Sequence, residues 1–589
     1  MTFSFDDKQF LMDGKPFPMM SGAIHYFRCP AEYWRDRLLK LKECGLNTVE
    51  TYVAWNWHEL TPGNFDFSGI LDLGRFLDTA AELGLYAIVR PGPFICAEWE
   101  GGGLPAWLLS IPGMRIRCNN EPYKARVRMF FEKLFEIIVP RQCTKGGNVI
   151  MLQVENEYGS YGDDKEYLIW LKNLYRELGA DVLLYRADGN DPYMMAAAET
   201  GDRMFAAMNY GSNPVWHEER RLASGRPGPH LCGEYWCGWF DHWHEAHHSR
   251  SAENIAEEID TFLSIGAGFN FYMFFGGTNF GFWSGANGEP VYAPTTTSYD
   301  YDGLLNEAGD RTPKYYAVRD VIGKHFPGTV PALTAKESEK KAYGTVPFVG
   351  TAKLFDHVKE VAGVSVHSGQ PMTMEELGSY YGYVLYDTDL NFEIEGTLDP
   401  KNVADRLTFF ADRKLVGAME NGRENTKPVL PEGTRHVSIL CENMGRINYG
   451  PDTLDSKGLR GIRFGFHYHM GWQNTALPMD DLSRLTFDEV QTPAEPAFHK
   501  AILHVDGTPC DTFLSMEGFH KGFVTVNGFN IGRYYNDSTP QKTLYVPATL
   551  LREGDNEIVV FEADRTERTS IEFKDAPVFC DLPTVGNPC

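Results

Sequence analysis

The sequence predicts an α/β fold joined to an all-β part: an N-terminal (β/α)8 barrel followed by two β-sandwich domains. Over roughly the first 320 residues, helix-like segments end in Gly and pass at once into short apolar strands. About eight such strands alternate with helical or loop lengths, which is typical of a (β/α)8 barrel. From about residue 376, short alternating strands separated by Gly, Asn and Pro turns dominate. That pattern is typical of antiparallel sandwiches.

Two kinds of sequence pattern predict the barrel strands. Glycine tolerates the left-handed conformation that ends a helix, and an apolar strand follows such a Gly in KECGLNTVETYV, AELGLYAIVRP, RELGADVLLY and LSIGAGFNFYMF. Apolar runs of strand-forming residues predict the others, near 19–24, 149–154, 205–208 and 230–234. The helices after the fifth and sixth strands are poorly marked, so a doubly wound open sheet is the alternative. Long strand-to-helix junctions rich in Gly, Trp and Tyr favour the barrel.

The domain boundaries are expected at changes of composition. The barrel should occupy 1–325, and a linker or an excursion that joins a β-domain should occupy 326–375, where Pro, Gly and a charged patch gather. The sandwiches should occupy 376–485 and 486–589. An internal echo, LPEGTRHVSILCEN against LREGDNEIVVFEAD, indicates two related modules. We expect them to brace the barrel or close one side of its pocket, with a sugar-binding surface as the alternative.

Composition excludes several classes of partner. The formal charge of -25 and the pI near 5.1 would repel nucleic acid and anionic membranes, whereas a neutral sugar is indifferent to that field. No stretch approaches 18 apolar residues, and the start lacks the basic and apolar regions of a leader, so we expect a cytoplasmic protein without membrane segments. The 11 scattered cysteines predict reduced thiols. A homodimer is left open.

The stretch NVIMLQVENEYGSY, residues 148–161, carries two carboxylates out of the end of an apolar strand. Side chains alternate along a strand, so Glu155 and Glu157 share one face, with Glu155 one pleat deeper and Glu157 at the mouth. A strand end with two solvated glutamates is the plainer interpretation. We expect Glu155 to support the barrel interior.

A third carboxylate, Glu234, ends the seventh strand within CGEYWCGWFDHWH. Aromatic rings beside carboxylates suit a sugar site, because apolar sugar faces stack on rings while hydroxyls need fixed acceptors and donors. Glu157 and Glu234 at one barrel mouth could flank a glycosidic bond, one donating a proton and the other attacking the anomeric carbon. The gap between such carboxyls is about 5 to 5.5 Å in retaining enzymes and about 6.5 to 9.5 Å in inverting ones.

One motif points to a different chemistry. His244, Glu245 and His248 fit H-E-x-x-H, which on a helix would bind zinc with the glutamate as base. The segment has no apolar stripe that would bury a helix face, so we expect no metal. Glycine clusters lack the spacing of nucleotide-binding loops, so we expect no cofactor.

Five segments, in order along the chain, resemble glycoside hydrolase family 35, the family 35 β-galactosidases. They are RPGPFICAEW, QVENEYGSYG, GEYWCGWFDHW, MFFGGTNFG and TTSYDYDGLLNEAG. The resemblance implies a retaining double displacement on terminal, non-reducing β-D-galactose, with Glu157 as acid/base and Glu234 as nucleophile. It also implies galactose-binding-like sandwiches after the barrel.

The resemblance implies further contacts with galactose. Asn156 would bind the hydroxyl beside the anomeric carbon, and the galactose subsite would be lined by Tyr52, Cys96, Ala97, Glu98 and Tyr301. Two positions depart from the family pattern: Trp236 and Phe282 stand where relatives can carry Tyr. The departures concern fine contacts rather than the chemistry.

A group of tryptophans bears on the linkage that is cleaved. Trp236, Trp239 and Trp243 follow the nucleophile, where a second sugar would stack, and such a wall favours a β-1,3-linked partner such as N-acetylglucosamine. The expected partners are galactoside oligosaccharides. Two alternatives stay open: an exo-β-glucosaminidase on the same scaffold, and a non-catalytic carbohydrate-binding protein.

Overall fold

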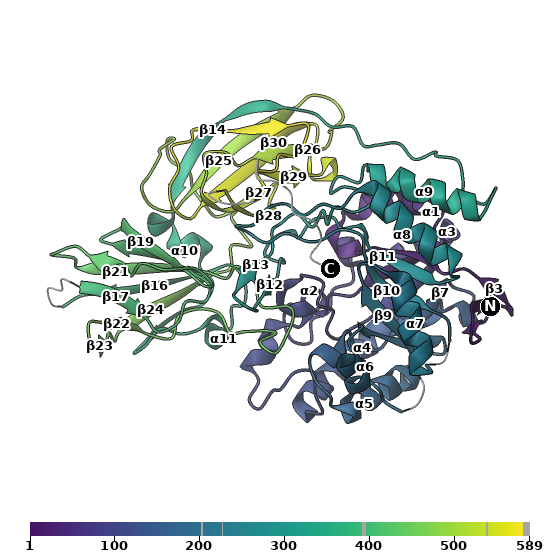
Figure 1. Cartoon of the computed structure of the whole chain (residues 1–589). Helices are drawn as coiled ribbons and strands as arrows, with labels where there is room; N and C mark the ends of the chain where they lie inside the picture. The colour runs from purple at the N-terminus through teal and green to yellow at the C-terminus, as the bar shows by residue number, and fades with distance from the viewer. Residues whose placement is uncertain (202–203, 227, 392–395, 537–539, 581–589) are drawn as a thin grey trace.

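The N-terminal part of the chain is a closed barrel of eight parallel strands (Figure 1). The computed structural model describes residues 1–201, 204–226, 228–391, 396–536 and 540–580. The barrel order is β4 to β9 in sequence, closed by β10 and β11. The strands are β4 (Met20–Ile24), β5 (Thr48–Tyr52), β6 (Tyr86–Arg90), β7 (Val149–Gln153), β8 (Leu183–Gly189), β9 (Phe205–Tyr210), β10 (Leu231–Trp236) and β11 (Gly268–Phe275). The predicted barrel is confirmed, and the open sheet is wrong.

Helices surround the barrel. The long ones are α1 (Trp34–Glu43), α3 (Leu73–Glu82), α4 (Glu121–Ile138), α5 (Lys165–Glu177), α7 (Pro214–Ser224), α8 (Ala252–Ser264) and α9 (Pro313–His325), and the short ones are α2 (Trp55–His58) and α6 (Pro192–Ala197). Two further short helices, α10 (Val358–Val361) and α11 (Met374–Leu377), lie with the β-domains instead. The poorly marked positions are α6 and α7. The first is only 6 residues long, and both start at a Pro, so the fixed backbone of this Pro rather than an apolar stripe marks where they begin.

A small meander of β1 (Phe3–Phe5), β2 (Phe10–Met12) and β3 (Lys15–Phe17) covers the amino ends of the barrel strands. The rings of Phe5 and Phe10 lie 5.2 and 5.3 Å from Phe205, the first residue of β9. Phe17 lies 5.3 Å from Tyr86, the first residue of β6. This end of the barrel is therefore sealed by aromatic side chains, which leaves the carboxyl ends for a site.

The first β-domain packs two antiparallel sheets face to face. One sheet holds β15 (Ser365–Ser368), β24 (Trp472–Leu477), β16 (Tyr383–Asp389), β21 (His436–Glu442), β18 (Arg406–Ala411) and β19 (Lys414–Glu420), and the other holds β20 (Val429–Leu430), β17 (Gly396–Pro400), β22 (Ile462–Phe464) and β23 (His467–Tyr468). Phe409 and Ile439 of the first sheet share a buried core with Leu398 and Phe464 of the second.

The second β-domain is an eight-stranded assembly. Its order is β28 (Phe529–Tyr535), β27 (Lys521–Val526), β30 (Gly554–Glu562), β25 (Ala497–Val505), β14 (Gly344–Lys353), β31 (Ser570–Lys574), β26 (Thr512–Ser515) and β29 (Thr543–Val546). The two strands of the internal echo, β21 and β30, occupy inner positions in their respective sheets. The end of this expected domain, 581–589, lies outside the described residues.

The segment expected as a linker or excursion, 326–375, supplies strands to both β-domains. In the second domain β14 pairs with β25 and β31, and it is the teal strand among yellow ones in Figure 1. Val346 and Phe348 alternate inward along it and join the domain core. In the first domain β15 pairs with β24. Pro347 and Gly350 hide the strand pattern of β14 in the sequence, because both residues are poor strand formers.

The three domains share buried contacts. The guanidinium of Arg533 in β28 donates to Ser284 Oγ of a barrel loop at 2.6 Å and to the carbonyl of Met444 in the first β-domain at 3.2 Å. A further loop hairpin, β12 (Ala286–Asn287) with β13 (Ala293–Pro294), lies beside this junction. The β-domains therefore brace the loops at the carboxyl end of the barrel.

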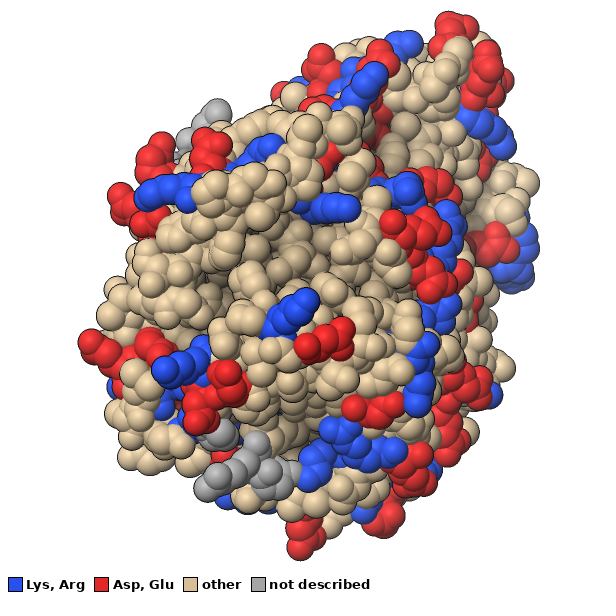
Figure 2. Space-filling model, turned by 90° about the vertical axis from the view of Figure 1, so that its right-hand side faces the viewer, with Lys and Arg blue, Asp and Glu red and all other residues tan. Residues whose placement is uncertain are grey.

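Charged side chains and unpaired cysteines are distributed over the described part of the chain. On the face shown in Figure 2, acidic and basic side chains lie interspersed rather than gathered by sign. The ten cysteines in the described part of the chain are unpaired. Among the described residues, no helix has both the length and the apolar character needed to cross a bilayer. The cytoplasmic location stays a prediction.

Candidate active site

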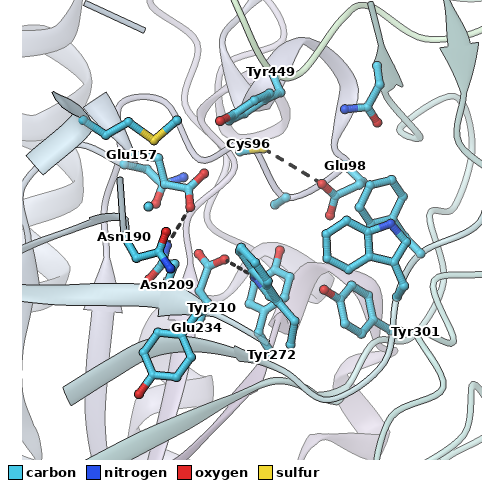
Figure 3. A pocket seen from close by; sticks show the side chains of 18 of the residues that line it. Cys96, Glu98, Glu157, Asn190, Asn209, Tyr210, Glu234, Tyr272, Tyr301 and Tyr449 are labelled. Atoms are coloured by element: carbon cyan, nitrogen blue, oxygen red, sulfur yellow. Dashed lines mark hydrogen bonds between the residues drawn. The ribbon is translucent and has the colours of Figure 1, made fainter. Parts of the chain in front are cut away.

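A cavity of about 360 Å³ opens at the carboxyl ends of the barrel strands (Figure 3). The ends of six barrel strands and the loops after most of them line it, and one residue comes from the first β-domain. The lining residues are Cys96, Ala97, Glu98, Asn156, Glu157, Gly189, Asn190, Asp191, Met194, Asn209, Tyr210, Glu234, Trp236, Trp239, Phe240, Tyr272, Asn287, Tyr301 and Tyr449. Glu157 and Glu234 point into the same cavity.

Glu234, near the end of β10, is held by two hydrogen bonds and one ion pair. Its Oε1 accepts from the Tyr52 hydroxyl at 2.8 Å and pairs with Arg90 Nη1 at 2.7 Å. Its Oε2 accepts from Trp236 Nε1 at 3.2 Å. Tyr52 and Arg90 end neighbouring strands β5 and β6, so the barrel itself positions the donors. The carboxylate is fixed in orientation before any ligand enters.

Glu157 has a different environment. It follows β7 in the left-handed conformation, with φ 46°, and its carboxylate accepts a hydrogen bond from Asn209 Nδ2 at 2.8 Å. Desolvation, followed by the nearby charge of Glu234, raises the pKa of Glu157 to about 8. Two carboxylates of one cavity thus differ in their partners: Glu234 meets a guanidinium, whereas Glu157 meets a neutral amide.

Asn156 is oriented by its neighbours. Arg90 Nη2 lies 2.6 Å from Asn156 Oδ1, and the Gln153 side-chain amide donates to the same oxygen at 3.0 Å. Because a guanidinium can only donate, Oδ1 must face it. The amide nitrogen donates one long hydrogen bond, of 3.4 Å, to the Ile95 carbonyl. Its second hydrogen is then available to a ligand. Asn156 therefore presents a donor.

The loop after β6 carries three consecutive residues in the left-handed conformation: Cys96, Ala97 and Glu98 have φ of 56, 57 and 47°. The Tyr299 hydroxyl donates to one oxygen of Glu98, and the other lies 3.9 Å from Cys96 Sγ. Burial, with a smaller contribution from the charge of Glu234, raises the pKa of Glu98 to about 7. This strained loop brings an acceptor carboxyl to the cavity wall.

Aromatic rings form much of the remaining wall. Tyr301, with φ 62°, has its ring 5.4 Å from that of Tyr272. Trp236 and Trp239 meet edge to face at 5.5 Å, and Trp239 stacks on Phe240 at 5.0 Å. Sugar rings can stack on such faces.

Three residues singled out from the sequence do not line the cavity. The structure does not bring Trp243 into the cavity: it is buried with Ile447 and Tyr535, where the barrel loop meets both β-domains. Phe282 also lies outside, with its ring 5.3 Å from Phe523 in a core shared by the β-domains. Tyr52 does not line the cavity itself but supports Glu234 from below.

Glu155 has a structural partner. Arg117 donates to both of its carboxylate oxygens, at 2.9 and 2.8 Å, and the backbone N–H of Asn156 donates at 2.6 Å. Both members of this ion pair are buried. The pair ties the end of β7 to the loop before α4, which positions the peptide between Glu155 and Glu157.

The H-E-x-x-H segment is not a helix. His244 has φ 74°, and its Nε2 lies 3.2 Å from a carboxylate oxygen of Glu420 in the first β-domain, so it does not share a face with His248. The zinc-enzyme alternative loses its geometric basis, because its two imidazoles must lie on one helix face. Asp241, Glu245 and His248 do lie close enough to hold a cation. His248 Nδ1 instead bonds Asp241 at 2.9 Å.

The sequence analysis did not assign a role to several residues that line or support the cavity. Asn209 is the next-to-last residue of the sixth strand and directly follows the predicted strand 205–208, so a polar residue at that strand end was a signal for it. Arg90 is the last residue of the third strand, but nothing in the sequence around it indicates that it pairs with Glu234. Tyr449 comes from a loop of the first β-domain, and only the tertiary structure shows that this loop reaches the cavity (Figure 3).

Comparison with known proteins places the chain in a family. Residues 9–325 match the model for glycosyl hydrolases family 35, residues 371–478 the first all-beta domain of beta-galactosidase, and residues 496–556 its galactose-binding domain. A beta-galactosidase of Xanthomonas manihotis is 40% identical, covering 92% of this chain and 91% of the relative. A beta-galactosidase of Bos taurus is 38% identical, covering 99% and 95%. The chain therefore belongs to glycosyl hydrolases family 35 and is a glycoside hydrolase of the β-galactosidase type.

Proposed function

We propose that the enzyme removes terminal, non-reducing β-D-galactose by a retaining double displacement, with Glu157 as acid/base and Glu234 as nucleophile. One observation carries the proposal: two carboxylates in one cavity have opposite surroundings. The pKa of Glu157 near 8 keeps it protonated at neutral pH, as a general acid requires. Glu234, fixed by Arg90 and Tyr52, is oriented for attack.

The first half-reaction uses both groups together. A Glu234 oxygen attacks the anomeric carbon while Glu157 gives its proton to the glycosidic oxygen, so the bond to the leaving sugar breaks and a galactosyl ester forms. The ester is neutral. Glu157 thereby loses the negative neighbour that raised its pKa, and it can ionise.

In the second half-reaction, Glu157 accepts a proton from water as the water attacks the anomeric carbon. The bond to Glu234 breaks and its carboxylate is regenerated. Each displacement inverts the anomeric carbon, so two together retain its configuration. One carboxyl group therefore serves as acid and then as base.

Asn156 supports a hydroxyl, rather than an amine, beside the anomeric carbon. Its amide nitrogen is the group left for a ligand, and a hydroxyl oxygen can accept from it. The protonated amine of a β-glucosaminide has no lone pair with which to accept. This favours a galactosidase over the exo-β-glucosaminidase alternative.

The proposal is tested by the anomer that is released first. With nitrophenyl β-galactoside as substrate and proton NMR as the readout, we expect β-galactose to appear first and to equilibrate later. We expect no comparable release from the α-galactoside or the β-glucosaminide, and no effect of a chelator. Initial release of α-galactose would show inversion, and faster turnover of the glucosaminide would replace the proposed substrate.

We propose further that β-1,3-linked galactosides are preferred, because Trp236, Trp239 and Phe240 form an aromatic wall beside Glu234. Stacking of a sugar on such a ring contributes about 1 kcal/mol, by analogy with aromatic pairs. Trp239→Ala should therefore lower the ratio of kcat/KM for β-1,3 over β-1,4 disaccharides by about fivefold. The measurement is galactose release from the two disaccharides.

Trp243→Phe is the matched control for the linkage prediction, because Trp243 is buried outside the cavity. That variant should change thermal stability without changing the linkage ratio. If the wild-type enzyme hydrolyses both disaccharides equally and Trp239→Ala leaves this equality untouched, the β-1,3 preference is wrong.

A further inference from the structure

A second cavity, of about 530 Å³, continues outward from the catalytic one. The two share Asn190, Tyr210 and Trp236 in their walls. The outer cavity adds the loop from Gly211 to Asn213 and the start of α7 with Trp216 and His217. The two cavities therefore adjoin at these three residues.

Trp216 is the main apolar surface of the outer cavity. Its residue is 45% exposed, which is high for a tryptophan in the first turn of a helix. The guanidinium of Arg220 lies 4.5 Å from the ring centroid over one face, and the His217 ring meets it edge to face at 4.8 Å. One face of the indole is thus covered by Arg220 of its own helix, and Trp216 lines the outer cavity.

The wall beside Trp216 is held rigid. His217 stacks on Tyr210 with ring centroids 3.5 Å apart, and Asn190 Nδ2 lies 3.4 Å from His217 Nδ1. Burial lowers the pKa of His217 to about 4, so its ring is neutral near pH 7. The residues that line this cavity, all within the described part of the chain, then carry no formal charge. Such a surface suits a neutral sugar, with amides and hydroxyls for its polar groups.

The direction of the leaving group points to this cavity. Figure 3 shows Asn190 and Asn209 beside Glu157, whereas Glu98 and Tyr301 lie on the other side of the cavity. The oxygen that receives a proton from Glu157 belongs to the leaving sugar, so that sugar begins at Glu157. Trp236 of the aromatic wall lines both cavities, so a leaving sugar that contacts Trp236 reaches the edge of the outer cavity. The next unit along the chain would then meet Trp216.

We propose that the outer cavity is a subsite for the third sugar unit, stacked on Trp216, and that the substrates are neutral galactosyl oligosaccharides of at least three units. The inference rests on the proposed function, because it takes Glu157 as the acid that marks the leaving group. It assigns a specificity residue, Trp216, outside the catalytic cavity.

The test compares the disaccharide Gal-β-1,3-GlcNAc with the trisaccharide Gal-β-1,3-GlcNAc-β-1,3-Gal. We expect kcat/KM for the trisaccharide to exceed that for the disaccharide by about three- to tenfold, the factor expected from one aromatic contact. Trp216→Ala should bring this ratio to about one, because only the longer substrate reaches the indole. Trp216→Phe should keep most of the ratio.

Tyr316→Ala is the control, because Tyr316 is similarly exposed, at 46%, on α9 and lines neither cavity. It should leave the ratio as in the wild-type enzyme. A wild-type enzyme that treats both substrates equally, or a Trp216→Ala variant that keeps the wild-type ratio, overturns the subsite. In either case nitrophenyl β-galactoside is still hydrolysed, whereas loss of that reaction in the wild type would contradict the proposed function itself.

Discussion

Replacing Glu234 by Gln is expected to lower kcat on nitrophenyl β-galactoside by about 10⁴-fold or more, because an amide cannot form the galactosyl ester. The amide keeps the volume of the side chain, and it can still accept from Tyr52 and Arg90. Folding should therefore be retained, and thermal unfolding measures that separately. The experiment is a steady-state assay at neutral pH.

Azide separates the role of Glu234 from that of the other carboxylate. In Glu234→Ala, azide can occupy the space of the missing side chain and displace the leaving group once, which gives α-galactosyl azide. Glu132→Gln is the control, since Glu132 is an exposed carboxylate on α4 and should leave activity unchanged. A Glu234→Gln enzyme with wild-type turnover, or a β-configured azide from Glu234→Ala, would end the nucleophile assignment.

Replacing Glu157 by Gln is expected to lower kcat by about 10²- to 10⁴-fold, the usual contribution of a general acid/base. An activated leaving group such as dinitrophenolate needs no proton, so that substrate should still form the galactosyl ester, which then accumulates. A burst of dinitrophenolate followed by slow turnover is the expected trace. Azide added to Glu157→Ala should restore turnover and give β-galactosyl azide, the product of two inversions.

The wild-type pH profile reports the same group. Glu157 must be protonated to act as acid, and its pKa is raised to about 8 by desolvation and by Glu234. Activity should therefore persist through pH 7 and fall as pH rises through about 8, as seen in kcat/KM. A profile that already falls near pH 5 would mean that the acid is an unperturbed carboxyl. An α-configured azide from Glu157→Ala would exchange the two assigned roles.

Much of the barrel was predictable because its marks are local. A Gly followed by an apolar run indicates the end of a helix and the start of the next strand. Repetition of this helix–strand pair predicts the barrel. Glu157 and Glu234 were predictable for the same reason. Each ends a strand, and the ends of parallel barrel strands converge on one mouth wherever the strands stand in the sequence.

Other features of the fold and the site could not be recognised from the residues next to them in the sequence. Pro347 and Gly350 obscure β14, which is a strand only because β25 and β31 lie on either side of it. Trp243 follows Trp239 by four residues, but the chain between them is not helical. Trp239 lines the cavity, whereas Trp243 is buried at the junction with the β-domains. Tyr449 reaches the cavity from another domain.

The sequence by itself determined the barrel, the two all-β domains, the family and the two carboxylates. Strand ends, turns and motifs are each formed by residues that are neighbours in the sequence, so they can be recognised there. Only the tertiary structure decided what surrounds those carboxylates. The Arg90 contact to Glu234, the Asn209 contact to Glu157 and the raised pKa of Glu157 all depend on residues from different strands and on removal of water. Burial and pairing between distant segments are properties of the folded chain, and no local pattern records them.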